Sequence, residues 1–87
     1  MDISERKILR SELLKKIYDH YFETGGEKYE VSIRILNDDP EGKMALEYLK
    51  EKGYIVVTYK GDGSQEYAPT VSGIDIVEDG KGTGIQE

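Results

Sequence analysis

One stretch decides the fold: ALEYLKEKGYIVV, residues 45–57, in which a helix ends, a stop signal follows and a strand begins. Ala45, Tyr48 and Leu49 share one face of a 3.6-residue period, which indicates an amphipathic helix packed on an apolar surface. Gly53 ends this pattern, because a residue without a Cβ atom can take the left-handed conformation that terminates helices. The β-branched residues that follow favour a strand at residues 54–59.

A turn and a helix start precede this stretch at residues 37–41. Asp39 can cap the helix, and Pro40 suits its first position. Glu41 adds an acidic group where the helix dipole favours one. We therefore predict a helix over residues 40–52.

A β-hairpin and a short final helix are predicted after it. The turn sequence Gly-Asp-Gly-Ser at residues 61–64 separates two segments, residues 54–60 and 66–68, that we expect to pair as strands. Thr70 then has the position of a helix N-cap. Gly73 weakens this helix, because glycine has a low helix propensity. The apolar residues on one side of the helix are Val71, Ile74 and Val77.

The N-terminal part of the chain predicts a long helix over residues 5–23. Ser4 is a good N-cap, and Glu5 lies in the first turn, where an acidic side chain is favoured. Gly25 and Gly26 end the helical pattern. The apolar residues form a wide stripe, which indicates packing on more than one element. This stripe consists of Ile8, Leu9, Leu13, Leu14, Ile17, Tyr18, Tyr21 and Phe22.

Residues 28–36 support two interpretations. Val31, Ile33 and Ile35 alternate with polar residues, which is the period of a strand. Val31 and Ile35, and likewise Ile33 and Leu36, also stand at helical spacings. The periodicity by itself slightly favours a strand.

Two segments resemble winged helix-turn-helix domains. The helix end Leu-Lys-Glu-Lys-Gly-Tyr-Ile at residues 49–55, followed by a β-ribbon, resembles the recognition helix and wing of these domains. Residues 69–77 are similar to the Leu-Thr-x-x-Gly segment that follows the wing in many of them. In size and layout the chain is similar to the small bacterial and phage-borne winged-helix proteins of the YjcQ type.

The resemblance implies an α+β fold, namely a single winged-helix domain with a three-helix core, a C-terminal β-hairpin wing and a short final helix. It also implies a short strand near Lys28 and Tyr29 followed by a helix. On that ground we predict a helix for residues 29–36. We assign residues 1–79 to the domain and residues 80–87, which have no apolar period, to a flexible C-terminal tail.

Composition narrows the classes of function. The length of 87 residues allows one domain with a modest core. The charged N-terminal residues are atypical of a signal peptide, and no run is long enough to span a membrane, so we expect a cytoplasmic protein. With no cysteine, the chain has no disulfide, thiolate nucleophile or cysteine-ligated zinc.

Candidate catalytic and metal sites have simpler explanations. Residues 37–42 match the opening of a calcium-binding loop, but its twelfth position is Tyr48, which has no carboxylate. His20 is the single histidine, and the sequence places no nucleophile beside it. We therefore expect a protein that is not an enzyme and has no metal, cofactor or small-molecule ligand.

The distribution of charge bears on the partner. A net charge of −6 opposes nucleic-acid binding unless the basic residues are segregated. Residues 1–60 carry 12 acidic and 11 basic side chains, whereas residues 61–87 carry 6 acidic side chains and the single base Lys81. The body of the chain is thus nearly neutral, which leaves room for a local basic face.

The first functional hypothesis is binding of double-stranded DNA by a module resembling transcription regulators. In this hypothesis the helix at residues 40–52 enters the major groove and the hairpin lies along the backbone. Few basic groups are available, so binding would be weak unless the protein dimerises. The expected DNA-contacting residues are Arg34, Lys43, Lys50, Lys52 and Lys60.

The second hypothesis is a protein-interaction module that docks a partner protein or a second copy of itself. The acidic C-terminal third and the mixed charges of residues 40–52 hinder approach to DNA, but they are compatible with a protein interface. The wide stripe of residues 5–23 leaves apolar surface that a homodimer could cover. Family resemblance alone places the DNA hypothesis slightly ahead.

Two tyrosines are the candidates for aromatic contacts with a partner. Tyr59 and Tyr67 are expected across from each other on the hairpin and half exposed. A plain cross-strand packing pair is the simpler interpretation.

Overall fold

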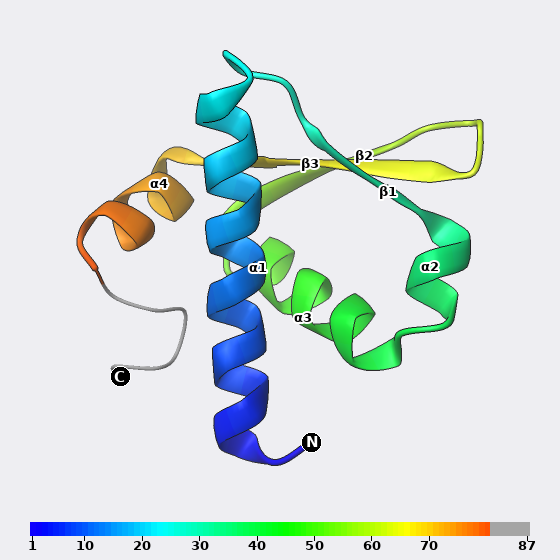
Figure 1. The fold of residues 1–87 in the computed structure, drawn as a ribbon, viewed down its shortest axis with the longest axis horizontal. Helices are drawn as coiled ribbons and strands as arrows, with labels where there is room; N and C mark the ends of the chain where they lie inside the picture. Colours follow the sequence, from blue (N-terminus) through cyan, green and yellow to red (C-terminus); the bar gives the residue numbers. More distant parts are fainter. Residues whose placement is uncertain (81–87) are drawn as a thin grey trace.

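The computed structural model describes residues 1–80 and has an α+β fold, in which helices pack around a three-stranded antiparallel sheet (Figure 1). The helices are α1 (Ile3–Glu23), α2 (Ile33–Asn37), α3 (Pro40–Glu51) and α4 (Val71–Glu78). The strands are β1 (Tyr29–Ser32), β2 (Ile55–Tyr59) and β3 (Ser64–Pro69). The predicted α+β class is confirmed. The predicted flexible tail, apart from Gly80, lies outside the described residues.

The start of α1 differs from the prediction. Asp2, not Ser4, is the N-cap: its carboxylate accepts a hydrogen bond from the Glu5 backbone N–H at 2.8 Å. The Glu5 carboxylate in turn accepts from the Asp2 backbone N–H at 3.0 Å. The earlier start is favoured because this reciprocal capping box satisfies two backbone donors, and a lone serine cap satisfies one.

The ambiguous segment contains both predicted alternatives in succession. β1 pairs antiparallel with β3, and α2 follows directly, with Ser32 as its N-cap. The Ser32 hydroxyl accepts a hydrogen bond from the Arg34 backbone at 3.2 Å, and the Ile33 N–H donates to the Gly63 carbonyl at 2.9 Å. The short strand implied near Tyr29 is present as β1, and the predicted helix is wrong for residues 29–32. Pairing with β3 outweighs the local helical spacing there, because it satisfies the backbone hydrogen bonds of the segment.

α3 confirms the predicted cap and stop. The Asp39 carboxylate accepts a hydrogen bond from the Gly42 N–H at 3.0 Å, and Pro40 is the first helical residue. Lys52 is the C-cap, and Gly53 follows it with a φ of 77°. Its left-handed conformation turns the chain directly into β2.

The sheet has β3 in its centre, with the strand order β1-β3-β2. Tyr67 of β3 lies opposite both Tyr29 of β1 and Val57 of β2. The predicted hairpin is confirmed, although β3 begins earlier than expected, at Ser64. This longer strand extends its pairing to the whole of β2.

The core lies between α1, α3 and the sheet. Leu14 and Ile17 of α1 are each only 1% exposed, and Leu49 of α3 is completely buried. Tyr67, the largest of the fully buried side chains, belongs to the same cluster. The middle of α1 therefore supplies the predicted apolar stripe, and its contacts extend to α3, β3 and α4.

α4 confirms the predicted final helix and explains its glycine. The Thr70 hydroxyl accepts a hydrogen bond from the Gly73 N–H at 3.1 Å and donates one to the Gly53 carbonyl at 2.6 Å. Gly73 lies so close to the Tyr54 carbonyl that a Cβ atom would overlap it. Glycine is thus required by packing at this position, despite its low helix propensity.

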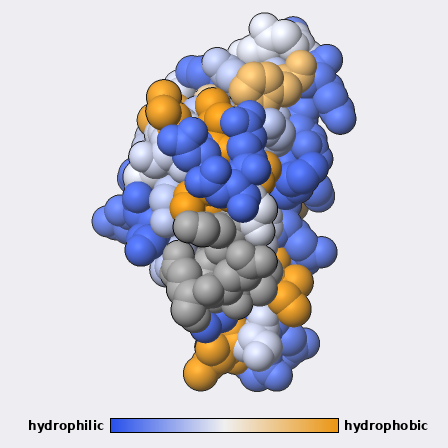
Figure 2. Space-filling view, turned by 90° about the vertical axis from the view of Figure 1, so that its left-hand side faces the viewer, coloured by the Kyte–Doolittle hydropathy of each residue, from blue (hydrophilic) through white to orange (hydrophobic). Residues whose placement is uncertain are grey.

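The side of the molecule that carries α4 has a mixed surface. Figure 2 shows apolar groups there in separate patches among hydrophilic ones. Ile3, Ile8 and Phe22 of α1 and Val71 of α4 are the large exposed apolar residues of these two helices. The homodimer through the apolar stripe of α1 stays a prediction. Among residues 1–80, each helix is too short or too polar to cross a bilayer.

Candidate functional site

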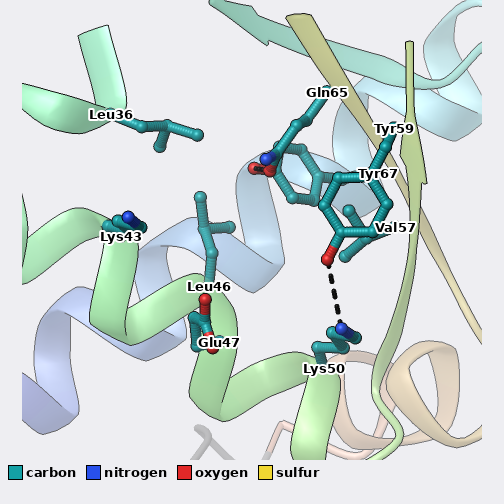
Figure 3. A pocket seen from close by; sticks show the side chains of 9 residues that line it. All are labelled: Leu36, Lys43, Leu46, Glu47, Lys50, Val57, Tyr59, Gln65 and Tyr67. Atoms are coloured by element: carbon teal, nitrogen blue, oxygen red, sulfur yellow. Dashed lines mark hydrogen bonds between the residues drawn. The ribbon is translucent and has the colours of Figure 1, made fainter. Parts of the chain in front are cut away.

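α3 and the β2–β3 hairpin enclose a small notch, with a volume of about 50 Å³ (Figure 3). Its floor is apolar and is formed by Leu36, Leu46, Val57 and Tyr67. Its rim is polar and combines donors with one carboxylate. The rim residues are Lys43, Glu47, Lys50, Tyr59 and Gln65.

The helical wall of the notch follows from residue spacing on α3. Lys43, Glu47 and Lys50 stand four and three residues apart, so they form one exposed row along the helix. Leu46 lies beside this row and is buried in the core. The notch therefore presents a carboxylate between two ammonium groups.

The sheet wall follows from strand register. Val57 and Tyr59 are two residues apart on β2, so their side chains share one face of the sheet. Tyr59 lies opposite Gln65, and Val57 lies opposite Tyr67. Consequently the exposed tyrosine and the glutamine meet at the rim, and the other pair forms the floor (Figure 3).

A direct contact joins the two walls. The Lys50 ammonium donates a hydrogen bond to the Tyr59 hydroxyl at 3.1 Å and lies 5.5 Å from the centre of its ring. This hydrogen bond raises the pKa of Lys50, so the ammonium stays charged at neutral pH. Tyr59 uses only its acceptor in this contact, and Lys50 uses one of three donors.

Tyr67 is buried, which corrects the expectation that it is half exposed and lies across from Tyr59. Its side chain is only 2% exposed, and the observed register places Tyr59 opposite Gln65 instead. The error arose from the hairpin turn: β3 begins at Ser64, which shifts the pairing relative to the expected one. The Tyr67 hydroxyl donates to the Gln65 Oε1 at 2.7 Å, and burial raises the pKa of its phenol to about 12.

Lys60, the predicted DNA contact of the wing, is surrounded by carboxylates. Its ammonium lies 2.9 Å from Glu30, 3.7 Å from Asp62 and 3.8 Å from Glu66. The hydrogen bond to Glu30 raises the pKa of Lys60, and the same contact lowers the pKa of Glu30. The positive charge of the hairpin turn is thus neutralised within the protein.

The remaining predicted DNA contacts lie apart from the notch. Arg34 borders an open hollow beside the hairpin turn, together with Asp38 and Asp62. Lys52 is exposed at the C-terminal end of α3. Of the five basic residues predicted to contact DNA, the structure brings Lys43 and Lys50 together at one cavity.

Two rim residues were not predicted as sites. Glu47 was visible only as part of the mixed charge of the helix, and Gln65 fell outside the predicted strand. Gln65 becomes recognisable only from the register, because its partner Tyr59 was already a candidate. Strand register is a tertiary property that a short polar segment does not specify by itself.

A second polar contact lies on the other side of α3 and is structural in character. Arg6 of α1 donates two hydrogen bonds to the Glu41 carboxylate, at 3.0 and 3.1 Å. Arg10 lies over the Tyr48 ring, with its guanidinium carbon 4.0 Å from the ring centre. These contacts join α1 to α3. Within the described chain, His, Asp and Glu side chains form no group that could hold a metal ion.

Comparison with known proteins gave no match to a family model, to a curated protein or to a solved structure.

Proposed function

We propose that the chain is a winged-helix domain that docks a partner protein through the face formed by α3 and the β2–β3 hairpin, here called the α3–hairpin face. The order of elements supports the winged-helix part of the proposal: a helix, a short strand, two helices and a hairpin follow one another, and the sheet order is β1-β3-β2. In this arrangement α3 corresponds to the recognition helix and the hairpin to the wing.

The charge of the α3–hairpin face is the observation that carries the docking proposal. Glu47 lies between Lys43 and Lys50 on the exposed row of α3, and Lys60 is neutralised by three carboxylates. A duplex presents a dense row of phosphates, so each acidic group on this face repels it. Mixed charges are ordinary at protein interfaces, where they give orientation and specificity.

An exposed aromatic side chain at the rim of this face supports the same proposal. Tyr59 on β2 is 64% exposed. Tyrosine is enriched at protein interfaces because its ring buries a large area while its hydroxyl forms a hydrogen bond.

DNA binding is the second candidate, and one observation favours it. Lys43 and Lys50 lie on one exposed row of α3, about 10 Å apart along the helix axis at 1.5 Å per residue. This row could contact neighbouring phosphates. The expected complex is weak, with a shallow dependence on salt, because few phosphates would be neutralised.

One pair of variants separates the two candidates. Lys50→Glu reverses a charge on the α3–hairpin face, and Lys7→Glu makes the same change at a partly exposed position of α1. We expect fluorescence anisotropy with a random duplex to detect no binding by wild-type protein at physiological salt. Duplex binding that Lys50→Glu abolishes and Lys7→Glu preserves would replace the docking proposal with the DNA candidate.

The docking proposal has a direct test with the same two variants. We expect the wild-type protein, immobilised as bait, to capture a defined partner from the cells that produce it. Lys50→Glu should reduce capture of that partner, and Lys7→Glu should not. Equal capture by all three baits would place the interface elsewhere.

A further inference from the structure

The rim of the notch holds more hydrogen-bond donors than its own contacts use. Lys50 has two donors left after its bond to Tyr59, and the Tyr59 hydroxyl keeps its own hydrogen. Lys43 adds an exposed ammonium, for which no ion pair is found among residues 1–80. A ligand that accepts hydrogen bonds and carries negative charge complements these groups.

The floor orients one further donor. Tyr67 is buried and keeps its proton, so it donates to the Gln65 Oε1 at 2.7 Å. This contact uses one lone pair of the Gln65 oxygen, and the Gln65 amide NH₂ group remains as a donor for a ligand at the rim. Because Tyr67 is held in the core, it fixes the orientation of this amide before any ligand arrives.

The shape of the notch favours an amino-acid side chain over a phosphate group. A volume of about 50 Å³ above an apolar floor admits the tip of a small apolar side chain, while a planar carboxylate can lie at the polar rim. A phosphodiester would leave the apolar floor uncovered. Glu47 can accept a hydrogen bond from a peptide N–H, a donor that a phosphodiester lacks.

We propose that the notch recognises an acidic residue next to an apolar residue in the docking partner: Lys50, Tyr59 and Gln65 bind the carboxylate, and the floor receives the apolar side chain. This inference rests on the proposed docking function and specifies its chemistry. Lys43 supplies long-range attraction, and Glu47 binds the backbone of the partner segment. The charge complementarity of the rim identifies the occupant.

The test is a titration of ¹⁵N-labelled protein with the capped tripeptide acetyl-Leu-Glu-Ala-amide, followed by heteronuclear NMR. We expect saturable shifts of the Lys50, Tyr59 and Gln65 amides. The matched probe acetyl-Leu-Gln-Ala-amide should bind roughly tenfold more weakly, because it loses the charge-assisted hydrogen bonds. Equal affinities, shifts confined to other surfaces, or no saturable shift at the notch would overturn the inference.

Three variants refine this test. Lys50→Met and Tyr59→Phe keep most of each side chain but remove the ammonium or the hydroxyl, so each should reduce the preference for the glutamate probe several-fold. Lys52→Met is the matched control outside the notch and should leave the preference for the glutamate probe unchanged. Equal loss of preference in Lys50→Met and Lys52→Met would show a general charge effect and would overturn the inference.

Two outcomes distinguish this inference from the proposed docking function. Inorganic phosphate that shifts the same amides as strongly as the glutamate probe would show a site for anions in general, and the peptide inference would fail. Capture of a partner that depends on Lys50 but resists excess glutamate probe would leave the docking function standing without this specificity.

Discussion

Lys50 at the notch and Lys60 at the hairpin turn are both predicted DNA contacts, and they have opposite surroundings. Lys50 donates to a neutral hydroxyl and retains two donors. Lys60 lies within 4 Å of three carboxylates. The pKa is raised for both lysines, so both are charged, yet only Lys50 is available to a partner. Basic residues therefore predict a binding surface only when their neighbours are known.

The two regions also differ in what supports them. The floor of the notch contains Tyr67, which is part of the core, so the packing of the domain supports this part of the site. The cluster around Lys60 is formed by exposed and partly exposed side chains of β1, the hairpin turn and β3. Exposed ion pairs of this kind contribute little to stability. Substitutions in the floor of the notch should therefore lower the stability of the protein much more than substitutions in the Lys60 cluster.

The largest expected effect comes from the two tyrosines of the hairpin. Tyr67→Ala removes a buried aromatic ring and should lower the free energy of unfolding by about 3–5 kcal/mol. Tyr59→Ala removes a ring that is 64% exposed and should cost about 1 kcal/mol or less. Urea denaturation followed by circular dichroism measures both values. Similar costs for the two variants would contradict the assignment of Tyr67 to the floor.

Ionisation of Tyr67 at alkaline pH should have an intermediate effect on stability. Burial raises the pKa of Tyr67 from 10.0 to about 12, so the unfolded chain releases this proton more readily than the folded one. The contribution of Tyr67 to stability is thus complete below pH 10 and is lost as the pH rises toward 12. We expect urea titrations between these pH values to show a steeper decline for wild type than for Tyr67→Phe.

The matched control for this effect is Tyr59→Phe. It lacks the same hydroxyl at an exposed position and should keep most of the wild-type decline, because burial is the largest cause of the raised pKa of Tyr67 and the charge of Tyr59 is a smaller one. A decline that is unchanged in Tyr67→Phe would assign the alkaline sensitivity to another group.

The smallest expected effect concerns the cluster at the turn. Combining Glu30→Gln, Asp62→Asn and Glu66→Gln leaves Lys60 without its acidic partners and should strengthen binding to a random duplex at low salt several-fold. Fluorescence anisotropy at several salt concentrations measures the change. Adding Lys60→Gln to the triple variant is the control, and it should reverse the gain from freeing this ammonium.

The acidic partners of Lys60 also predict how the stability of the protein changes with pH. The hydrogen bond from Lys60 lowers the pKa of Glu30. The contact therefore contributes to stability at pH values above the ordinary glutamate pKa. This contribution is lost as the pH falls through the lowered pKa of Glu30. Acid titration of the triple variant should therefore show a slightly smaller loss of stability than that of wild type.

Local signals determined most of the elements of this protein. The Asp39 cap, Pro40 at the first position and Gly53 after the last turn predicted α3 and the start of β2, because these residues act on their immediate neighbours. Thr70 predicted α4 in the same way. Each of these signals depends on backbone geometry within a few residues, so the sequence by itself carries it.

Only the tertiary structure decided the rest. Residues 28–36 became a strand and then a helix because β3 offered hydrogen bonds to the first half. Tyr67 lies in the floor and Gln65 lies at the rim, because pairing across the hairpin sets the register of β3. Lys60 is not available to a partner because it is paired with Glu30, a residue 30 positions away in the chain. Register, burial and ion pairing join distant segments, and for that reason no local pattern in the sequence determines them.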